Sequence, residues 1–481
     1  MTHKLIDTIV AMFYLIFFKY LNFAETGFIR RRLMAMAGQK PVSAYNFNCS
    51  QARKAICMNK SMVLHFRPRT VDIRALKFSM TFGLGGMAFV LIILLFFTGL
   101  LLKFYYLPLP EKAYDSILHL KENVLFGSFI RNIHYWSANV LILITFLHLL
   151  RVFLTSAFHP PRAVNWIIGI ALLLIVIAFN FTGYLLPWDQ LSFWAVTICT
   201  GMLEYMPFVG EWLQTFTRGG GDVSASTLSI FFAGHTALLP AVLIIVLPFH
   251  FWQIHKSGGI ALPLKRDNIG EYNQKVKAIP DLIIREVATA LVITAFILVL
   301  SIIFDAPIGD RANPGLSPNP SKAPWYFMGF QEILLHIHPF FAVSVLPAAI
   351  LILLIWLPFM KYSPESQGIW FISKTGRQAA MFSFFAAMLL SVSAIIADEY
   401  LPDFPALLPG IPVIISNGLF PLFTALLAFA FFYHSLVKRY HPKKNEKAQA
   451  IFLFFITIFI TFTVTGVWFR GSSMKLLWPW L

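Results

Sequence analysis

The stretch 131–151, with the sequence RNIHYWSANVLILITFLHLLR, is apolar for most of its length but carries a histidine near each end, His134 and His148. Ionisable side chains inside a membrane span are costly and normally engage a partner. A step of fourteen residues falls about 40° short of four helical turns, so both histidines share a helix face, about 21 Å apart along the axis. This distance is too long for one metal ion and predicts two sites stacked along one helix.

A second stretch, 232–254, repeats the pattern with His235 and His250, fifteen residues apart. This longer step ends about 60° past four full turns. Pro240 and Pro248 lie between the two histidines and can bend the helix enough to absorb the difference. Both stretches therefore present a pair of histidines roughly on one face.

Two such spans that run in the same direction bring His134 opposite His235 and His148 opposite His250. Neutral imidazoles facing each other in apolar surroundings are typical ligands of haem iron. A single histidine in a span is more often a hydrogen-bonded structural residue, but four at matching heights on two helices favour two bis-histidine haem sites.

Composition places these helices in a membrane. Of 481 residues, 58% are hydrophobic and only 12% are charged, whereas globular proteins carry about 25% charged residues. This excludes a water-soluble enzyme and makes membrane lipid the main surrounding medium. We predict an all-α integral membrane protein whose first four spans form a dihaem four-helix bundle. Nine spans of about 20 apolar residues are expected at 78–104, 132–155, 164–186, 232–254, 282–304, 341–360, 378–397, 412–436 and 449–469.

The net charge of +16 would suggest a nucleic-acid partner in a soluble chain. Here 29 of the 38 Lys and Arg residues fall in the N-terminal segment and in alternate loops with their adjoining span ends. Such an excess marks the cytoplasmic side. It predicts a cytoplasmic N-terminus and no nucleic-acid partner.

Residues 1–77 form a basic lead-in in which 5–23 is expected to be an interfacial helix, with a signal peptide as the alternative.

The three cysteines, Cys49, Cys57 and Cys199, form no CxxC or CxxCH motif and no disulfide framework. Redox chemistry must therefore rest on other residues.

Glycines recur at the histidine interval in the first and third spans. A macrocycle edge needs small residues beside it, although glycine also permits close helix packing in membranes. Two arginines each lie three residues from a histidine and could pair with haem propionates, with interfacial anchoring as the alternative. These residues are Gly85, Gly99, Gly169, Gly183, Arg131 and Arg151.

Three segments, 131–138, 148–152 and 183–190 (GYLLPWDQ), resemble cytochrome b of the Rieske/cytochrome b quinol–cytochrome c reductases. The resemblance is specific over 78–265 and weaker over 280–397, which is similar to a three-helix quinol-site part that chloroplast-type complexes encode separately. The fifteen-residue histidine step and Pro-Trp-Asp-Gln resemble the chloroplast and Firmicute branch. Residues 398–481 add two further helices.

The resemblance implies a subunit of a bacterial inner-membrane complex with two non-covalent b-type haems, the outer one ligated by His134 and His235 and the inner one by His148 and His250. Quinol, with menaquinol favoured, is oxidised at the outer side beside Tyr184, and protons are translocated. A Rieske iron–sulfur protein, a c-type cytochrome and a dimeric complex are the implied partners. A haem b membrane anchor of another quinone-linked dehydrogenase and a non-redox transporter are the alternatives.

The chain departs from the family at the outer site. The family signature Pro-Glu-Trp-Tyr reads Ala323-Pro324-Trp325-Tyr326 here, and proline has no group that can accept a proton. Glu332 is the nearest carboxylate that could replace the missing glutamate as base, with anchoring of the next span as the alternative.

The inner side departs as well. Gly83 stands where the chloroplast-type branch has a cysteine that binds an extra haem, so no covalent haem is expected. His255 replaces an arginine of that branch, and Lys256 follows it. Both are candidates for binding an inner quinone, and interfacial anchoring is the alternative.

Overall fold

The computed structural model describes residues 69–263, 275–360, 368, 370–371 and 373–478. The predicted interfacial helix at 5–23 therefore lies outside the described residues, as do Cys49 and Cys57. The described part of the chain is mostly helical, and it has one short antiparallel pair of strands, β1 (Thr70–Asp72) and β2 (Lys275–Lys277).

Nine helical segments in the described part of the chain are long and apolar enough to cross a membrane, which confirms the predicted fold class. Several continue into polar residues at their ends, so they are longer than hydropathy alone predicts. Their cores are α6 (Leu84–Lys103), α8 (Gly127–Leu154), α9 (Ala163–Leu185), α12 with α13 (Ala225–Ala233 and Leu239–Lys256), α14 (Ile283–Ile303), α16 (Leu346–Trp356), α17 (Lys374–Tyr400), α19 (Phe420–Tyr440) and α20 (Lys444–Val464).

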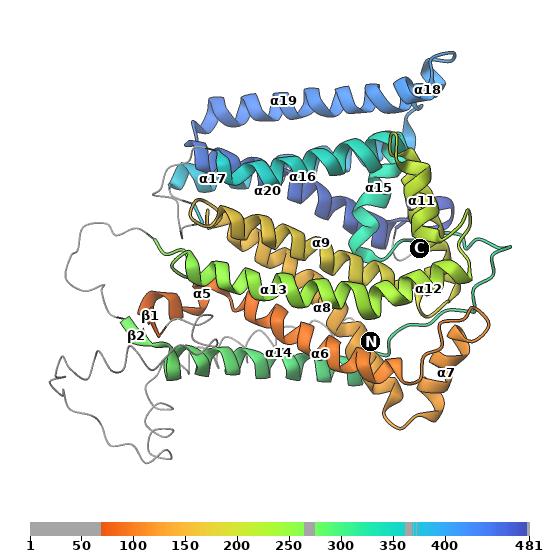
Figure 1. Cartoon of the computed structure of the whole chain (residues 1–481). Coiled ribbons are helices and arrows are strands. Elements are labelled where there is room, and N and C mark those ends of the chain that lie inside the picture. Colours follow the sequence, from red (N-terminus) through yellow and green to blue (C-terminus); the bar gives the residue numbers. More distant parts are fainter. Residues whose placement is uncertain (1–68, 264–274, 361–367, 369, 372, 479–481) are drawn as a thin grey trace.

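Shorter helices occupy the connections. At one end of the long helices lie α7 (Ala113–Asn123), α10 (Gln190–Gly201), α11 (Gly210–Arg218), α15 (Met328–His336) and α18 (Phe404–Leu407); at the other lies α5 (Phe78–Thr81). Figure 1 shows the long helices running side by side, with the β1–β2 pair at the end opposite α7 and α11.

The first four spans form a bundle in which α6 packs on α8, α8 on α9, and α9 on α13. The rings of Phe89 on α6 and Phe251 on α13, 5.5 Å apart, close the bundle. Helix α14 packs against α6 and α8, on the opposite side of the bundle from α16, α17 and α20 (Figure 1).

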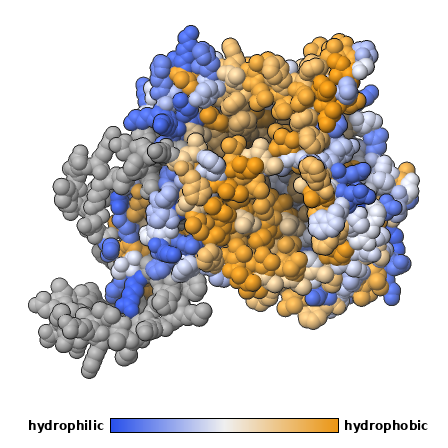
Figure 2. All heavy atoms as spheres, turned by 45° about the horizontal axis from the view of Figure 1, so that its top comes forward, coloured by the Kyte–Doolittle hydropathy of each residue, from blue (hydrophilic) through white to orange (hydrophobic). Residues whose placement is uncertain are grey.

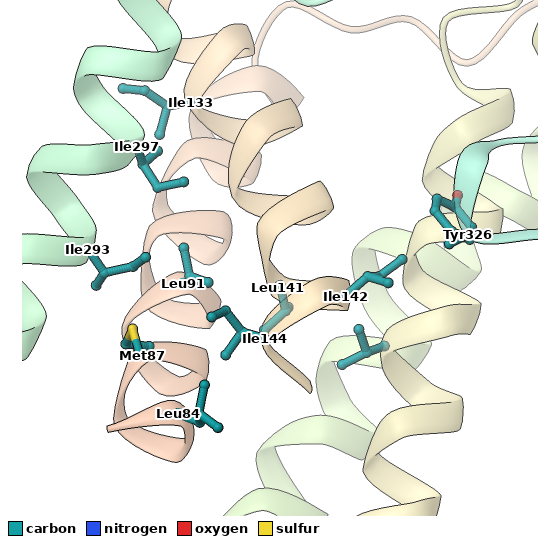
Figure 3. Packing of buried hydrophobic residues seen from close by; sticks show 11 residues of the cluster. Leu84, Met87, Leu91, Ile133, Leu141, Ile142, Ile144, Ile293, Ile297 and Tyr326 are labelled. Atoms are coloured by element: carbon teal, nitrogen blue, oxygen red, sulfur yellow. The ribbon is translucent and has the colours of Figure 1, made fainter. Parts of the chain in front are cut away.

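The main apolar core lies between α6, α8 and α14 (Figure 3). Leu91, Ile142 and Ile297, one from each helix, are completely buried. Tyr326, which precedes α15, reaches this cluster from the far side of the bundle. The predicted bundle and the start of the C-terminal part therefore share one core.

The lateral surface is apolar. In Figure 2 a broad hydrophobic band crosses the molecule, with hydrophilic residues gathered toward its two ends. Large side chains such as Phe423 and Phe431 on α19 are more than half exposed on this surface. Such a band is suited to contact with the hydrocarbon core of a membrane.

The last span is tied to α17 by one carboxylate. Glu446, near the start of α20, is almost fully buried. Its Oε1 accepts hydrogen bonds from the backbone N–H and hydroxyl of Ser373, at 2.8 and 2.6 Å, and its Oε2 accepts from the N–H of Lys443 at 3.2 Å. A single side chain thus satisfies free N–H groups at the first turns of both α17 and α20.

Candidate functional site

Two of the four span histidines face each other in the bundle. The ring centres of His134 on α8 and His235, just before α13, are 6.2 Å apart. With metal–imidazole bonds of about 2.0 Å, two imidazoles that bind one ion from opposite sides have ring centres roughly 6 Å apart. The separation therefore fits a shared metal ion.

The fifteen-residue step is absorbed differently from our expectation. His235 lies in a π-helical turn, Gly234–Leu238, which inserts an extra residue into the helix. Because of this extra residue, the fifteen-residue step from His235 to His250 returns to nearly the same helix face as the fourteen-residue step from His134 to His148. The π-helical turn ends directly before α13, whose second residue is Pro240, so the backbone adjustment occurs at His235 itself rather than midway between the histidines.

The hydrogen bonds of this pair define which ring nitrogen is free. Nδ1 of His235 lies 3.0 Å from the carbonyl oxygen of Phe179, which can only accept, so Nδ1 carries the proton. The hydroxyl of Thr98 donates to the Leu94 carbonyl at 2.7 Å, and its oxygen can accept from Nδ1 of His134 at 2.9 Å. In both residues Nε2 is then unprotonated and available as a metal ligand.

His148 and His250 occupy corresponding positions about 21 Å further along their helices. Among the described residues, neither Nδ1 has a hydrogen-bond partner. Buried polar atoms are normally satisfied, so this pair differs from His134 and His235, whose Nδ1 atoms both have partners.

Each predicted glycine faces one histidine ring. That the glycines admit a macrocycle edge stays a prediction; the structure places each of them beside an imidazole. A side-chain carbon added to Gly183 would lie 2.6 Å from Cε1 of His235, and one on Gly99 would lie 3.1 Å from Cε1 of His134. On Gly85 and Gly169 it would lie 3.6 Å from Cε1 of His148 and His250. The glycines thus fix how closely α6 and α9 approach the histidines.

The two arginines differ in their contacts. Arg131 donates to the carbonyls of Ala306 and Pro307, at 2.8 and 2.7 Å, so it holds the chain that leaves α14. Arg151 donates from Nε to the Met80 carbonyl at 2.7 Å, while its buried Nη2 has no partner in the described part of the chain. Arg151 therefore keeps a donor for an acidic group, and pairing of either arginine with a propionate stays a prediction.

Sequence comparisons agree with this arrangement. A family model described as Cytochrome b/b6/petB matches residues 72–258. A cytochrome b6 from Heliomicrobium gestii is 45% identical over 177 residues, which are 37% of this chain and 83% of that protein. One from Prochlorococcus marinus (strain MIT 9515) is 41% identical over 175 residues, 36% of this chain and 80% of that protein.

The chain belongs to the cytochrome b/b6 family. Its similarity to solved structures extends beyond the four-helix bundle. The match to a chain of a hyperthermophilic respiratory Complex III spans 80% of this chain and 96% of that chain, with a TM-score of 0.60 and 26% identity. This cytochrome b is therefore a membrane electron-transport protein of the bc type, and members of its family bind b-type haem.

In this cytochrome b the Pro-Trp-Asp-Gln turn binds the loop that follows α14. Asp189 caps α10 through the N–H of Ser192 at 2.9 Å and accepts from the N–H of Gly309 at 3.0 Å. Gln190 accepts from the N–H of Asn313 at 2.6 Å. The Trp188 side chain is buried, and its backbone lies in the left-handed region with φ of 53°. The two long connections therefore form one structure at this end.

The predicted quinol-site tyrosines come together. Burial raises the pKa of Tyr326, and the nearby phenols of Tyr184 and Tyr135 and the thiol of Cys199 raise it further. Burial likewise raises the pKa of the Cys199 thiol to about 11. Tyr326 and Cys199 thus stay protonated at neutral pH and can donate hydrogen bonds.

Trp325 contacts the bundle directly. Its Nε1 donates to Oδ1 of Asn139 at 2.7 Å, and the amide nitrogen of Asn139 donates to the Tyr135 carbonyl at 2.9 Å. Pro324 precedes the short helical turn Trp325–Phe327. The altered signature is therefore held against α8 by an indole–amide hydrogen bond.

Glu332 does not have the environment of a free base. It is completely buried, and Nη2 and Nε of Arg470 donate to it at 2.6 and 3.1 Å. Burial alone would raise the pKa of Glu332, but hydrogen bonds from His336 and Arg470 hold it below its usual value. A carboxylate held in this way is a poor proton acceptor, so the structure argues against the predicted base and places Glu332 in an anchor between α15 and the end of α20.

The anchor continues to the molecular surface. His336 lies 3.3 Å from Glu332 and 2.7 Å from Asp398, and Arg470 also donates to Glu399 at 2.7 Å. We refer to Glu332, His336, Asp398, Glu399 and Arg470 as the anchor network. It joins α15, α17 and the residues that follow α20.

Protonated His336 is expected to stabilise the protein only below alkaline pH. Burial lowers its pKa, but the hydrogen bonds and negative charges of Asp398 and Glu332 outweigh burial and raise it to about 9. Because the pKa is raised in the folded state, the full stabilisation is present below the unfolded-state pKa of about 6.5. It is lost as the pH rises through 9, and the free energy of unfolding then falls by at most about 3 kcal/mol. Thermal unfolding of the detergent-solubilised protein between pH 7 and 10 measures this loss.

His336→Gln should flatten that dependence, whereas the control His119→Gln, at an exposed position of α7, should retain it. Equal slopes in His336→Gln and the parent protein would contradict the assignment.

At the opposite end, the predicted inner-site residues His255 and Lys256 lie in the last turn of α13. The Lys256 ammonium lies 4.9 Å from the ring centre of Trp252, an arrangement that also suits interfacial anchoring. Gly83 has φ of 64°, and an added side-chain carbon would lie 2.9 Å from Cγ2 of Thr289, so this position favours glycine for local reasons.

Sequence reasoning missed Thr98, Thr182, Asn139 and Arg470. The two threonines carried a signal, because each directly precedes one of the recurring glycines. Asn139 is a polar residue in the middle of a span and was detectable on that ground. Arg470 had no local signal, since its partner Glu332 is 138 residues away.

Proposed function

We propose that this chain is the dihaem subunit of a quinol:cytochrome c oxidoreductase of the bc type. The observation that carries the proposal is the facing pair His134 and His235, 6.2 Å apart with Nδ1 of each ring engaged and Nε2 free. The glycine–histidine contacts at His148 and His250 support a second site of the same kind.

His134 and His235 would ligate the outer haem, and His148 and His250 the inner haem. Bound haem supplies reversible one-electron transfer. The chain's own residues hold the imidazoles by hydrogen bonds, exclude water from the bundle and set the distance between the two sites. Arg151 would pair with an acidic group of the inner haem.

Quinol would bind near Tyr184 and Tyr326, with Pro324 and Trp325 forming the adjoining turn. Protonated phenols there can donate hydrogen bonds to a quinone oxygen. The group that accepts the quinol proton is not Glu332 in this proposal, because that carboxylate is held by Arg470. His255 and Lys256 would border an inner quinone.

The proposed setting is a bacterial inner membrane, with the N-terminus cytoplasmic and His134 and His235 toward the outer side, as the Lys and Arg asymmetry supports. The proposed partners are a Rieske iron–sulfur protein and a c-type cytochrome in a dimeric complex. The similarity to a respiratory Complex III chain supports this assembly. Menaquinol is the proposed donor, and protons would be released on the outer side.

Purification of the native complex tests the proposal. A pyridine-haemochrome spectrum should give two b-type haems per chain, and haem staining of this chain after denaturing electrophoresis should be negative. A co-purifying Rieske protein is expected. Haem without a Rieske protein would favour a membrane anchor of another quinone-linked dehydrogenase, and absence of haem would favour a transporter.

A further inference from the structure

Two threonines contact the histidines of one pair. Thr98 lies 2.9 Å and Thr182 3.3 Å from Nδ1 of His134 and His235, measured from their hydroxyl oxygens. The hydroxyl of Thr182 donates to the Ala178 carbonyl at 2.8 Å, so its oxygen, like that of Thr98, is left as an acceptor. Both imidazoles therefore donate toward a hydroxyl on the neighbouring helix.

In the described part of the chain the other pair lacks this feature, because Nδ1 of His148 and Nδ1 of His250 have no hydrogen-bond partner there. The glycines that face His148 and His250 are preceded by Leu84 and Ile168, whose side chains have no polar atom. Since Gly85 and Gly99, and Gly169 and Gly183, are each one fourteen-residue interval apart, the Leu84 and Ile168 positions correspond to those of Thr98 and Thr182. The two histidine pairs are therefore similar in arrangement but differ in whether a hydroxyl lies beside the imidazoles.

The difference has an electronic consequence. A histidine that donates from Nδ1 becomes a more basic ligand through Nε2, and a more basic ligand stabilises the oxidised, more positive iron. Hydrogen bonding around a haem is one of the means by which proteins set its reduction potential.

We propose that Thr98 and Thr182 are positioning residues that lower the reduction potential of the haem at His134 and His235 relative to the haem at His148 and His250. This inference rests on the proposed function. It makes electron transfer from the outer to the inner haem favourable in the direction that opposes the membrane potential.

The test is a redox titration of the purified complex, followed through the two b-haem absorption bands. Thr98→Val keeps the side-chain shape and removes the acceptor. The ratio of reduced to oxidised outer haem at a fixed ambient potential should rise about fivefold, the equilibrium equivalent of one ordinary hydrogen bond, while the inner haem is unchanged. Thr98→Ser should restore the parent value.

Thr182→Val should have a smaller effect, because Nδ1 of His235 lies closer to the Phe179 carbonyl, at 3.0 Å, than to the Thr182 hydroxyl, at 3.3 Å. The reverse substitution, Leu84→Thr, introduces a hydroxyl beside His148 and should lower the potential of the inner haem alone. This variant provides an independent measurement if Thr98→Val does not assemble.

Unchanged potentials in both Thr98→Val and Leu84→Thr, or equal shifts of both haems in either variant, would overturn the inference. A parent protein without two b-type haems would instead refute the proposed function. The two failures are therefore distinguishable before any variant is made.

Discussion

Gly183→Ala should remove the outer haem and leave the inner haem in place. The added carbon would lie 2.6 Å from Cε1 and 3.1 Å from Nδ1 of His235, closer than non-bonded carbon atoms approach. His235 must then move away from α9 and lose its hydrogen bond to Phe179. Displacement of His235 and loss of its supporting contact should weaken haem binding by about 10- to 100-fold. Haem content should fall from two to one per chain, with quinol oxidation abolished.

Gly169→Ala is the matched control. It adds the same group in the same helix, but the new carbon would lie 3.6 Å from Cε1 of His250, an ordinary van der Waals contact. Two haems per chain are expected in this variant. Two haems with unchanged spectra in Gly183→Ala would show that His235 is not held by α9 in the way described.

Arg470→Leu should destabilise the protein by about 3–5 kcal/mol, since it leaves the fully buried carboxylate of Glu332 without its guanidinium partner. Glu332 has no exposed surface, so water cannot replace Arg470. Thermal or denaturant unfolding in detergent measures the loss. Because replacement of a whole buried ion pair by apolar residues is often neutral, the double variant Arg470→Met with Glu332→Leu should recover most of the stability.

The exposed residue Arg439, at the end of α19, provides the control. Arg439→Leu removes the same charge outside the anchor network and should change stability by no more than about 0.5 kcal/mol. If Arg470→Leu and Arg439→Leu change the free energy of unfolding by the same amount, the anchor network does not hold α15 to the end of α20.

The features that the sequence predicts well are those that depend on local periodicity. Apolar length located the spans, and the helical repeat gave the pairing of His134 with His235, which the structure brings together. The π turn at Gly234 could not be predicted, because a local change of hydrogen-bond register leaves no distinct pattern in apolar residues.

The environment of Glu332 was beyond sequence reasoning for another reason. Its proximity to the altered signature in the chain suggested a role there, but the direction in which α15 presents it depends on packing. Met328 and Gly329 pack against Gly466 and Phe459 of the α20 segment, which turns Glu332 toward Arg470. Tyr326, only a few residues earlier, instead joins the core of the bundle.

The turn at Asp189 and Gln190 has a consequence for how the protein could be divided. It holds Gly309 and Asn313, about 120 residues later, through hydrogen bonds, and Arg131 holds Ala306 in the same way. Covalent continuity between α13 and α14 is therefore not needed to keep these parts aligned. Two polypeptides produced by a break in that connection would still carry the groups that form these hydrogen bonds, on complementary surfaces.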